Sequence, residues 1–130
     1  MIYTGRFDKV EQYRHDGLIP VSIAGYAPPD YQGIQFKTLA PKYYWWKEWH
    51  DKKLDNDWYK AKYRETVLNT LNPKVIANRL KNFGENVILL CYEPPQEFCH
   101  RHLVADWLRK SGISVQEYTT TKINFSVNSR

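Results

Sequence analysis

The sequence predicts a single α/β domain of three layers, in which a mostly parallel sheet of about four to five strands carries helices on both faces. Two apolar runs, at 19–24 and 87–91, indicate strands that are buried on both faces, as central parallel strands are. Helix-like segments separate the candidate strands, and parallel strands need such crossovers. The length of 130 residues is that of one domain.

The first part of the chain predicts two strands around a short helix. Residues 2–7 are partly β-branched and aromatic, which favours a strand. Asp8 is a candidate cap for a short helix that ends before Gly17. The second strand, at 19–24, is followed by a loop at 25–30, because that segment is dense in turn-forming residues.

Two aromatic-rich helices are expected in the middle of the chain. Pro41 suits the first turn of the first helix, which carries tyrosines and tryptophans at 43–49. Asp55 or Asn56 suits the cap of the second helix. In that helix, apolar or aromatic residues recur at every fourth position, at Tyr59, Tyr63 and Val67.

A third helix and the most apolar strand follow. Asn72 is a good helix cap and Pro73 a good first helical residue. Gly84 fits the position just past the end of this helix. The strand at 87–91 comes next, and its unbroken apolar character is typical of the centre of a parallel sheet.

The C-terminal part predicts one more helix and one more strand. The helix covers 99–110, and Gly112 prevents it from continuing. The strand covers 113–118. Residues 119–130 are expected to form a tail, or an edge strand where the pattern alternates at 123–127.

Several classes of protein are excluded by what the sequence lacks. No apolar run approaches the roughly 20 residues that cross a bilayer, so no membrane partner is expected. There is no secretory signal pattern, and two cysteines cannot form a disulfide framework, so we expect a cytoplasmic protein with free thiols. The six glycines are too scattered for a dinucleotide fingerprint or a phosphate-binding loop, which predicts a site without a cofactor.

Charge and aromatic content allow two interpretations. The formal net charge is +5, and the chain holds ten tyrosines, five tryptophans and five phenylalanines. Basic charge interleaved with flat rings suits a surface that follows phosphates and stacks bases. The same composition also describes a soluble protein with a modest basic excess and a core built from large rings.

The segment 91–102 is the strongest candidate for a functional site. In open α/β sheets, ligands bind beyond the carboxyl ends of the strands, where a loop leads into a helix. At about 100° per residue, the helix places His100 at the middle of its apolar face, with Cys99 and Arg101 on either side. We therefore expect His100 to point inward over the strand ends.

Each residue of this segment has a chemical and a structural interpretation. Cys99 in the first helical turn favours a thiolate, but a free cysteine is also a common small buried side chain. Arg101 could clamp a phosphate or carboxylate, or form a salt bridge with Glu93 or Glu97. Glu93 could act as a general acid or base, or bind Arg101.

A metal site is not predicted. Cys91, Cys99, His100 and His102 are all zinc-ligand types within twelve positions. His100 and His102 diverge on a helix, however, so the four cannot converge as closely spaced ligand pairs do. Cys91, inside the apolar strand, is expected to pack in the core.

Two short motifs carry a resemblance to a known family. The run CYE at 91–93, followed by CHR at 99–101, resembles the hallmark of the bacterial family catalogued as domain of unknown function 488. The strand end at 21–23 and the LAP run at 39–41 are also similar. The resemblance implies a small α/β fold whose hallmark residues gather at one end of the sheet, without naming a reaction. Carried over to this chain, those residues are Cys91, Glu93, Cys99, His100 and Arg101.

The first functional hypothesis is an enzyme that acts on a nucleotide or a nucleic-acid base. Arg101 and the helix N-terminus would hold an anionic group, Cys99 or Glu93 would be the nucleophile, and His100 would move protons. A glycosidic-bond transfer through Glu93 and a thiol-dependent transfer through Cys99 both suit, so the enzyme would be a transferase or hydrolase. The predicted substrate-binding residues are Arg101, Tyr92, Ser22, Tyr26, Tyr43 and Tyr44.

The second hypothesis is a non-catalytic nucleic-acid binding module. The segment 42–64 holds seven basic and four acidic residues among its tryptophans and tyrosines. Those rings would stack bases while the lysines follow phosphates. The same surface could instead form a symmetric homodimer.

Overall fold

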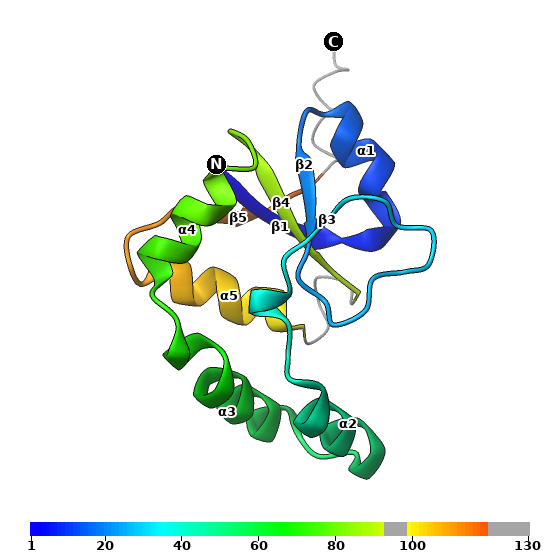
Figure 1. Cartoon of the computed structure of the whole chain (residues 1–130), viewed down its shortest axis with the longest axis vertical. Coiled ribbons are helices and arrows are strands. Elements are labelled where there is room, and N and C mark those ends of the chain that lie inside the picture. Colours follow the sequence, from blue (N-terminus) through cyan, green and yellow to red (C-terminus); the bar gives the residue numbers. More distant parts are fainter. Residues whose placement is uncertain (93–98, 120–130) are drawn as a thin grey trace.

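In the part of the chain that the structure describes, a parallel sheet of five strands forms the centre (Figure 1). The computed structural model describes residues 1–92 and 99–119. The strand order is β3-β2-β4-β1-β5, and all four neighbouring pairs are parallel. The strands are β1 (Ile2–Arg6), β2 (Ile19–Ser22), β3 (Ile34–Gln35), β4 (Val87–Cys91) and β5 (Val115–Glu117).

Helices cover both faces of this sheet, which confirms the predicted three-layer α/β architecture. In Figure 1, α1 lies on one side of the strands and α4 and α5 lie on the other, with α3 beside α5 and α2 farthest from the sheet. No helix among residues 1–92 and 99–119 combines the length and apolar character that a membrane span requires. The helices are α1 (Val10–His15), α2 (Tyr43–Lys52), α3 (Asn56–Thr66), α4 (Pro73–Lys81) and α5 (His100–Arg109), with short 3-10 turns at Phe7–Lys9, Lys37–Leu39 and Leu68–Thr70.

Strand β4 is buried along its whole length, as its unbroken apolar sequence predicts. Because side chains alternate along a strand, Val87 and Leu89 pack into the larger core beneath the helices α3, α4 and α5. Ile88 and Leu90 pack into the smaller core, where Tyr13 of α1 lies. The central strand therefore joins both halves of the hydrophobic interior.

The helix ends agree with the sequence prediction in most places. Asn72 caps α4 by accepting hydrogen bonds from two backbone N–H groups, and Pro73 is the first helical residue. Asp55 caps α3 by accepting from the N–H of Trp58 at 2.9 Å. Asp8 is not a cap: it lies within the 3-10 turn that precedes α1.

Two differences concern strands. β3 was not expected, because a two-residue strand is too short to show a periodic pattern. The edge strand predicted at 123–127 falls outside the residues that the structure describes, as does the rest of the segment 120–130.

The strand order places a crevice between the carboxyl ends of β2 and β4. From β2 the chain continues to β3 at one edge of the sheet, and from β4 it continues through α5 to β5 at the other edge. Adjacent strands whose connections leave in opposite directions define the position where open α/β sheets bind ligands. The segments that follow β2 and β4 therefore flank the natural binding position of this fold.

Gly5 lets α1 pack closely on β1, and this gives a test of the fold. A Cβ atom at this position would lie 2.6 Å from Tyr13 Oη and 2.8 Å from Ile88 Cδ1, both in the smaller core. We expect Gly5→Ala to lower the free energy of unfolding by about 1–3 kcal/mol through overpacking, as measured by urea denaturation. Gly25→Ala is the matched control, because no heavy atom of the described residues beyond its two chain neighbours lies within 4 Å of a Cβ there. Equal stability of the two variants would contradict this account of the packing.

Candidate functional site

A cleft of about 560 Å³ opens at the carboxyl ends of β2 and β4. Its floor is made by Cys91, the last residue of β4, and by Cys99 and His100 at the start of α5. The segment after β2 forms one wall, and α2 forms another. The sequence motif at the end of the chain thus lies at the binding position that the topology defines.

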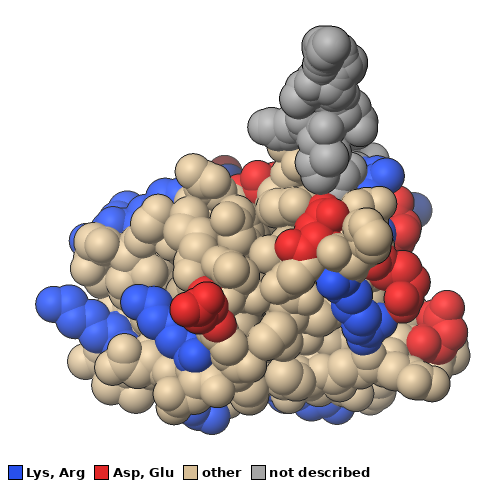
Figure 2. All heavy atoms as spheres, turned by 90° about the horizontal axis from the view of Figure 1, so that it is seen from above, with Lys and Arg blue, Asp and Glu red and all other residues tan. Residues whose placement is uncertain are grey.

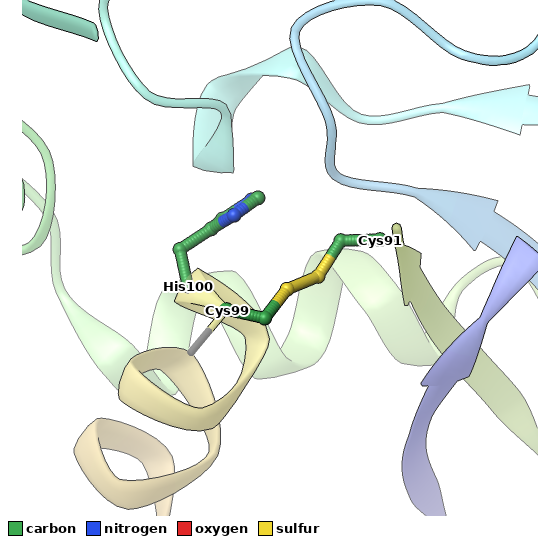
Figure 3. Close-up of side chains that lie close together, drawn as sticks. All are labelled: Cys91, Cys99 and His100. Atoms are coloured by element: carbon green, nitrogen blue, oxygen red, sulfur yellow. A yellow bond between two sulfur atoms is a disulfide. The ribbon is translucent and has the colours of Figure 1, made fainter. Parts of the chain in front are cut away.

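Cys91 and Cys99 are joined by a disulfide bond across the floor of the cleft (Figure 3). The sequence led us to expect free thiols, and to expect Cys91 in the core. Both cysteines are buried, at 1% and 2% exposure, yet both contribute to the cleft lining. Cys99 is the N-cap residue of α5, so the bond ties the beginning of that helix to the end of the central strand.

His100 points inward, as the helical phase predicts. In Figure 3 its ring is directed toward the segment that follows β2, while the Cys99 side chain is directed toward Cys91. His100 Nε2 donates a hydrogen bond to the carbonyl oxygen of Ile23 at 2.8 Å, and the ring packs edge-on against Tyr63 with centroids 5.4 Å apart. The hydrogen bond places the proton of the neutral ring on Nε2 and leaves the lone pair on Nδ1.

Burial lowers the pKa of His100 from 6.5 to about 4. Loss of solvation is the main cause, the positive charge of Arg101 lowers the pKa further, and the hydrogen bond to Ile23 opposes the shift. The imidazole is therefore neutral at pH 7. A ring with this pKa is a weak base near neutrality, and it can orient a reacting group through Nδ1 without carrying a charge.

Arg101 lies behind the cysteines and is fully buried, at 0% exposure. Its Nε and Nη2 atoms each donate to the Glu117 carboxylate of β5 at 3.2 Å. Its Nη1 atom lies 3.4 Å from the sulfur of Cys91. The sequence suggested Glu93 or Glu97 as the ion-pair partner, and both fall outside the described residues; within the described part of the chain, Arg101 forms an ion pair with Glu117.

Tyrosine side chains form the upper walls of the cleft. Tyr26, Tyr43 and Tyr92 are exposed and contribute to its lining. The Tyr92 hydroxyl donates to the carbonyl oxygen of Tyr26 at 2.6 Å and so links the segments after β4 and β2. Tyr26 meets Tyr43 edge-on, and Tyr43 stacks on Trp46, with ring centroids 6.4 Å and 6.2 Å apart.

Two other predicted site residues lie elsewhere. Ser22 is fully buried, and its Oγ accepts a hydrogen bond from the N–H of Ala24 at 3.3 Å, which shapes the turn after β2. Tyr44 is exposed on α2 but is not among the described residues that line the cleft. Glu93, the predicted carboxylate, belongs to the segment 93–98, which lies outside the described residues.

The structure adds lining residues that the sequence analysis missed. Trp46 and Trp49 of α2 and Lys37 and Lys42 at the cleft wall all contribute to the lining. Trp46 is three positions after Tyr43, so helical spacing could have placed both on one face. Lys37 stands outside any periodic pattern, and its Nζ lies 5.7 Å from the centre of the Tyr26 ring.

The described lining of the cleft is basic and aromatic. Its charged groups are Lys37 and Lys42, and no carboxylate lies among the described lining residues. The face shown in Figure 2 is different, because basic and acidic side chains lie there in separate small groups without one continuous basic patch. The two lysines of the described lining therefore favour an anionic ligand in the cleft.

The floor of the cleft also brings three metal-ligand types together. The donor atoms of Cys91, Cys99 and His100 lie within 4.8 Å of one another. A thiolate binds a metal only when its sulfur is free, and here both sulfurs are bonded to each other. Of these three side chains, the disulfide-bonded form leaves one imidazole as a metal ligand. We therefore assign no metal to this group.

The fold and the site define a small α/β protein with a cleft at the carboxyl ends of β2 and β4, and cysteine and histidine side chains form the floor of this cleft. The chain belongs to the DUF488 family: the DUF488-N3a family, described as the active DUF488-N3 subclade, matches residues 18–112. That range runs from the residue before β2 to three residues past the end of α5 and includes the floor of the cleft. No curated protein and no solved structure matches the chain.

The low pKa of His100 predicts a specific dependence of stability on pH. Between pH 6.5 and about 4 the unfolded chain binds a proton at this residue and the folded protein does not, so stability falls as the pH falls through that range. The contribution of His100 to this loss is about 3 kcal/mol. We expect His100→Gln to remove this part of the loss of stability, as measured by urea denaturation at several pH values between 7 and 4. His15→Gln, an exposed residue at the end of α1, is the control. An unchanged slope in His100→Gln would contradict a neutral buried imidazole.

Proposed function

We propose that this protein is a small enzyme that acts on a nucleotide or a nucleic-acid base without a bound cofactor. The substrate would bind in the cleft at the carboxyl ends of β2 and β4. The observation that carries the proposal is the combination of aromatic walls, two lysines and a cysteine–histidine floor in a single cleft. Aromatic walls accept a flat base by stacking, and lysines attract a phosphate.

The positions of these groups indicate how a nucleotide would lie. The base would lie against Tyr26, Tyr43 and Trp46, whose rings already contact one another. Its phosphate would face Lys37 and Lys42, which take the role that the sequence analysis gave to Arg101. Since the Arg101 guanidinium is bound to Glu117 and fully buried, it would act from behind the floor.

The reactive group in this proposal is a sulfur of the Cys91–Cys99 pair. The disulfide must first be reduced by two molecules of a cellular thiol or by one dithiol, whose two thiol groups supply two electrons and two protons and are oxidised to a disulfide. A thiolate can then attack an electrophilic carbon of the substrate, forming a carbon–sulfur bond while the leaving group departs with its electron pair. Nδ1 of His100 would accept a hydrogen bond from the reacting group. Glu93 stays a candidate carboxylate nucleophile from the sequence.

A nucleic-acid binding module is the alternative function. In the structure, fewer rings and charges of the segment 42–64 are available at the surface than this alternative expects. Of the rings in the segment 42–64, Trp45, Tyr59 and Tyr63 are buried in the core. The exposed lysines of α2 form ion pairs on their own helix, Lys47 with Asp51 and Lys52 with Glu48. Because these rings are buried and these lysines are paired with carboxylates, they are less available to a strand of nucleic acid. A single-stranded ligand would therefore also be expected at the cleft.

Nucleotide binding tests the lysine assignment. We expect a nucleoside monophosphate to quench tryptophan fluorescence, because Trp46 and Trp49 line the cleft. The double variant Lys37→Ala/Lys42→Ala is expected to raise Kd by about tenfold through loss of the attraction to phosphate. Lys74→Ala/Lys81→Ala on α4 is the matched control, because it removes the same charge from exposed positions. Equal weakening by both pairs, or no quenching at all, would count against the proposal.

Turnover tests the catalytic part. The reduced protein is incubated with nucleotides and with a single-stranded oligonucleotide, and released base or altered nucleotide is detected by mass spectrometry. We expect Cys91→Ser/Cys99→Ser to abolish product formation if a thiol is the nucleophile, and Glu93→Gln to abolish it if a carboxylate is. Tight, salt-sensitive oligonucleotide binding without any product would support the binding module instead.

A further inference from the structure

The buried face of the sheet brings three polar side chains toward α5. Residues of one strand alternate between faces, and Val87 and Leu89 of β4 face the core beneath α5, so Cys91 projects to the same side. By the same alternation, Thr4 of β1 and Glu117 of β5 project to that side, and they are register partners. Thr4 Oγ1 donates to Glu117 Oε1 at 2.6 Å, which fixes the position of the carboxylate.

Arg101 completes this group from the helix. It is among the largest fully buried side chains, and a buried guanidinium needs charged or polar partners to offset its lost hydration. Two of its nitrogens bind the two oxygens of Glu117, and Nη1 is directed at Cys91 Sγ. The carboxylate thus orients the guanidinium so that one edge faces the sulfur.

Cys99 lacks an equivalent partner among the described contacts. It is the N-cap of α5, and its side chain makes no capping hydrogen bond. The helix N-terminus favours a negative charge there, but the effect of a helix terminus is smaller than that of a guanidinium in direct contact in a site with little water. The two sulfurs of the bond are therefore in unequal surroundings.

We infer that Cys91, and not Cys99, is the attacking sulfur of the reduced site, and that Arg101 is the positioning residue that holds it as a thiolate, with Glu117 and Thr4 orienting Arg101. This inference rests on the thiol chemistry proposed above and deepens it. Cys99 is then the partner that closes the disulfide again when two electrons and two protons are removed from the pair by an oxidant such as a disulfide.

Among the described residues, the charged groups around Cys91 leave Arg101 as the one that most favours a thiolate. On α5, His100 is neutral at pH 7. On β5, the negative charge of Glu117 opposes a thiolate, but both of its oxygens are bound by Arg101 and one of them also by Thr4. On β1, Arg6 is the register partner of Cys91, and its Nε lies 2.8 Å from Asp8.

Two single-cysteine variants test the inference without a substrate. Cys99→Ser leaves only Cys91, and Cys91→Ser leaves only Cys99. Each reduced protein is held with a chelator, and the rate of alkylation by iodoacetamide and the ultraviolet absorbance of the thiolate are followed against pH, relative to the double variant. We expect the thiol of Cys91 to titrate at least about one pH unit below the usual 8.5, and that of Cys99 to titrate at the higher pH of the two.

A second set of variants, in the Cys99→Ser background, tests the role of Arg101. Arg101→Gln/Glu117→Gln removes the charged pair together, so that no lone charge is left buried, and it is expected to raise the apparent pKa of Cys91 by about one unit or more, a tenfold smaller ratio of thiolate to thiol. Arg109→Gln, on the same helix and paired with exposed Asp106, is the control and is expected to have no effect. Circular dichroism and thermal unfolding show that each variant is folded.

The inference is overturned if Cys99 titrates at the lower pH, or if removing the Arg101–Glu117 pair leaves the titration of Cys91 unchanged in a folded protein. Thiolate absorbance keeps the test decisive even where iodoacetamide reaches the floor of the cleft slowly. A failure of nucleotide binding or turnover leaves these titrations untouched, so the outcome for the proposed function is separate.

Discussion

The parallel pairing of β4 with β1 on one side and β2 on the other is the interaction on which the remaining structure depends. It fixes the register of Cys91 beside Arg6 and places the end of β4 next to the end of β2. Because β4 is buried on both faces, its position is held by the hydrophobic effect from two directions. The cleft, its sulfur-containing floor and the helix that follows all take their positions from this strand.

The chemistry of the site follows from the burial that the strand imposes. Little water reaches the floor, so charges there act strongly on one another, and an uncompensated charge would be costly. The imidazole responds by staying neutral, whereas the charge of the buried guanidinium is compensated by its ion pair with Glu117. The walls above carry exposed tyrosines, so one cleft combines a buried floor with an exposed, basic and aromatic entrance.

Local sequence signals predicted the elements that local interactions determine. The cap at Asn72, the apolar strand at 87–91 and the inward phase of His100 depend on neighbours a few positions away, and all are found in the structure. The partner of Arg101 could not be found in this way, because Glu117 reaches it only through the pairing of β5 with β1. The role of α2 as a cleft wall and the bond between the two cysteines likewise arise from tertiary packing, which leaves no periodic trace.

The strand order also has a consequence for how the protein is made. Strand β1 leaves the ribosome before the other strands of the sheet, yet its partners in the sheet are residues 87–91 and 115–117. At roughly 5–20 residues per second, the nascent chain must keep that strand unpaired for several seconds before its first partner emerges. Synthesis therefore sets the order of assembly, and β1 can take its place in the sheet only after β4 and β5 have been translated.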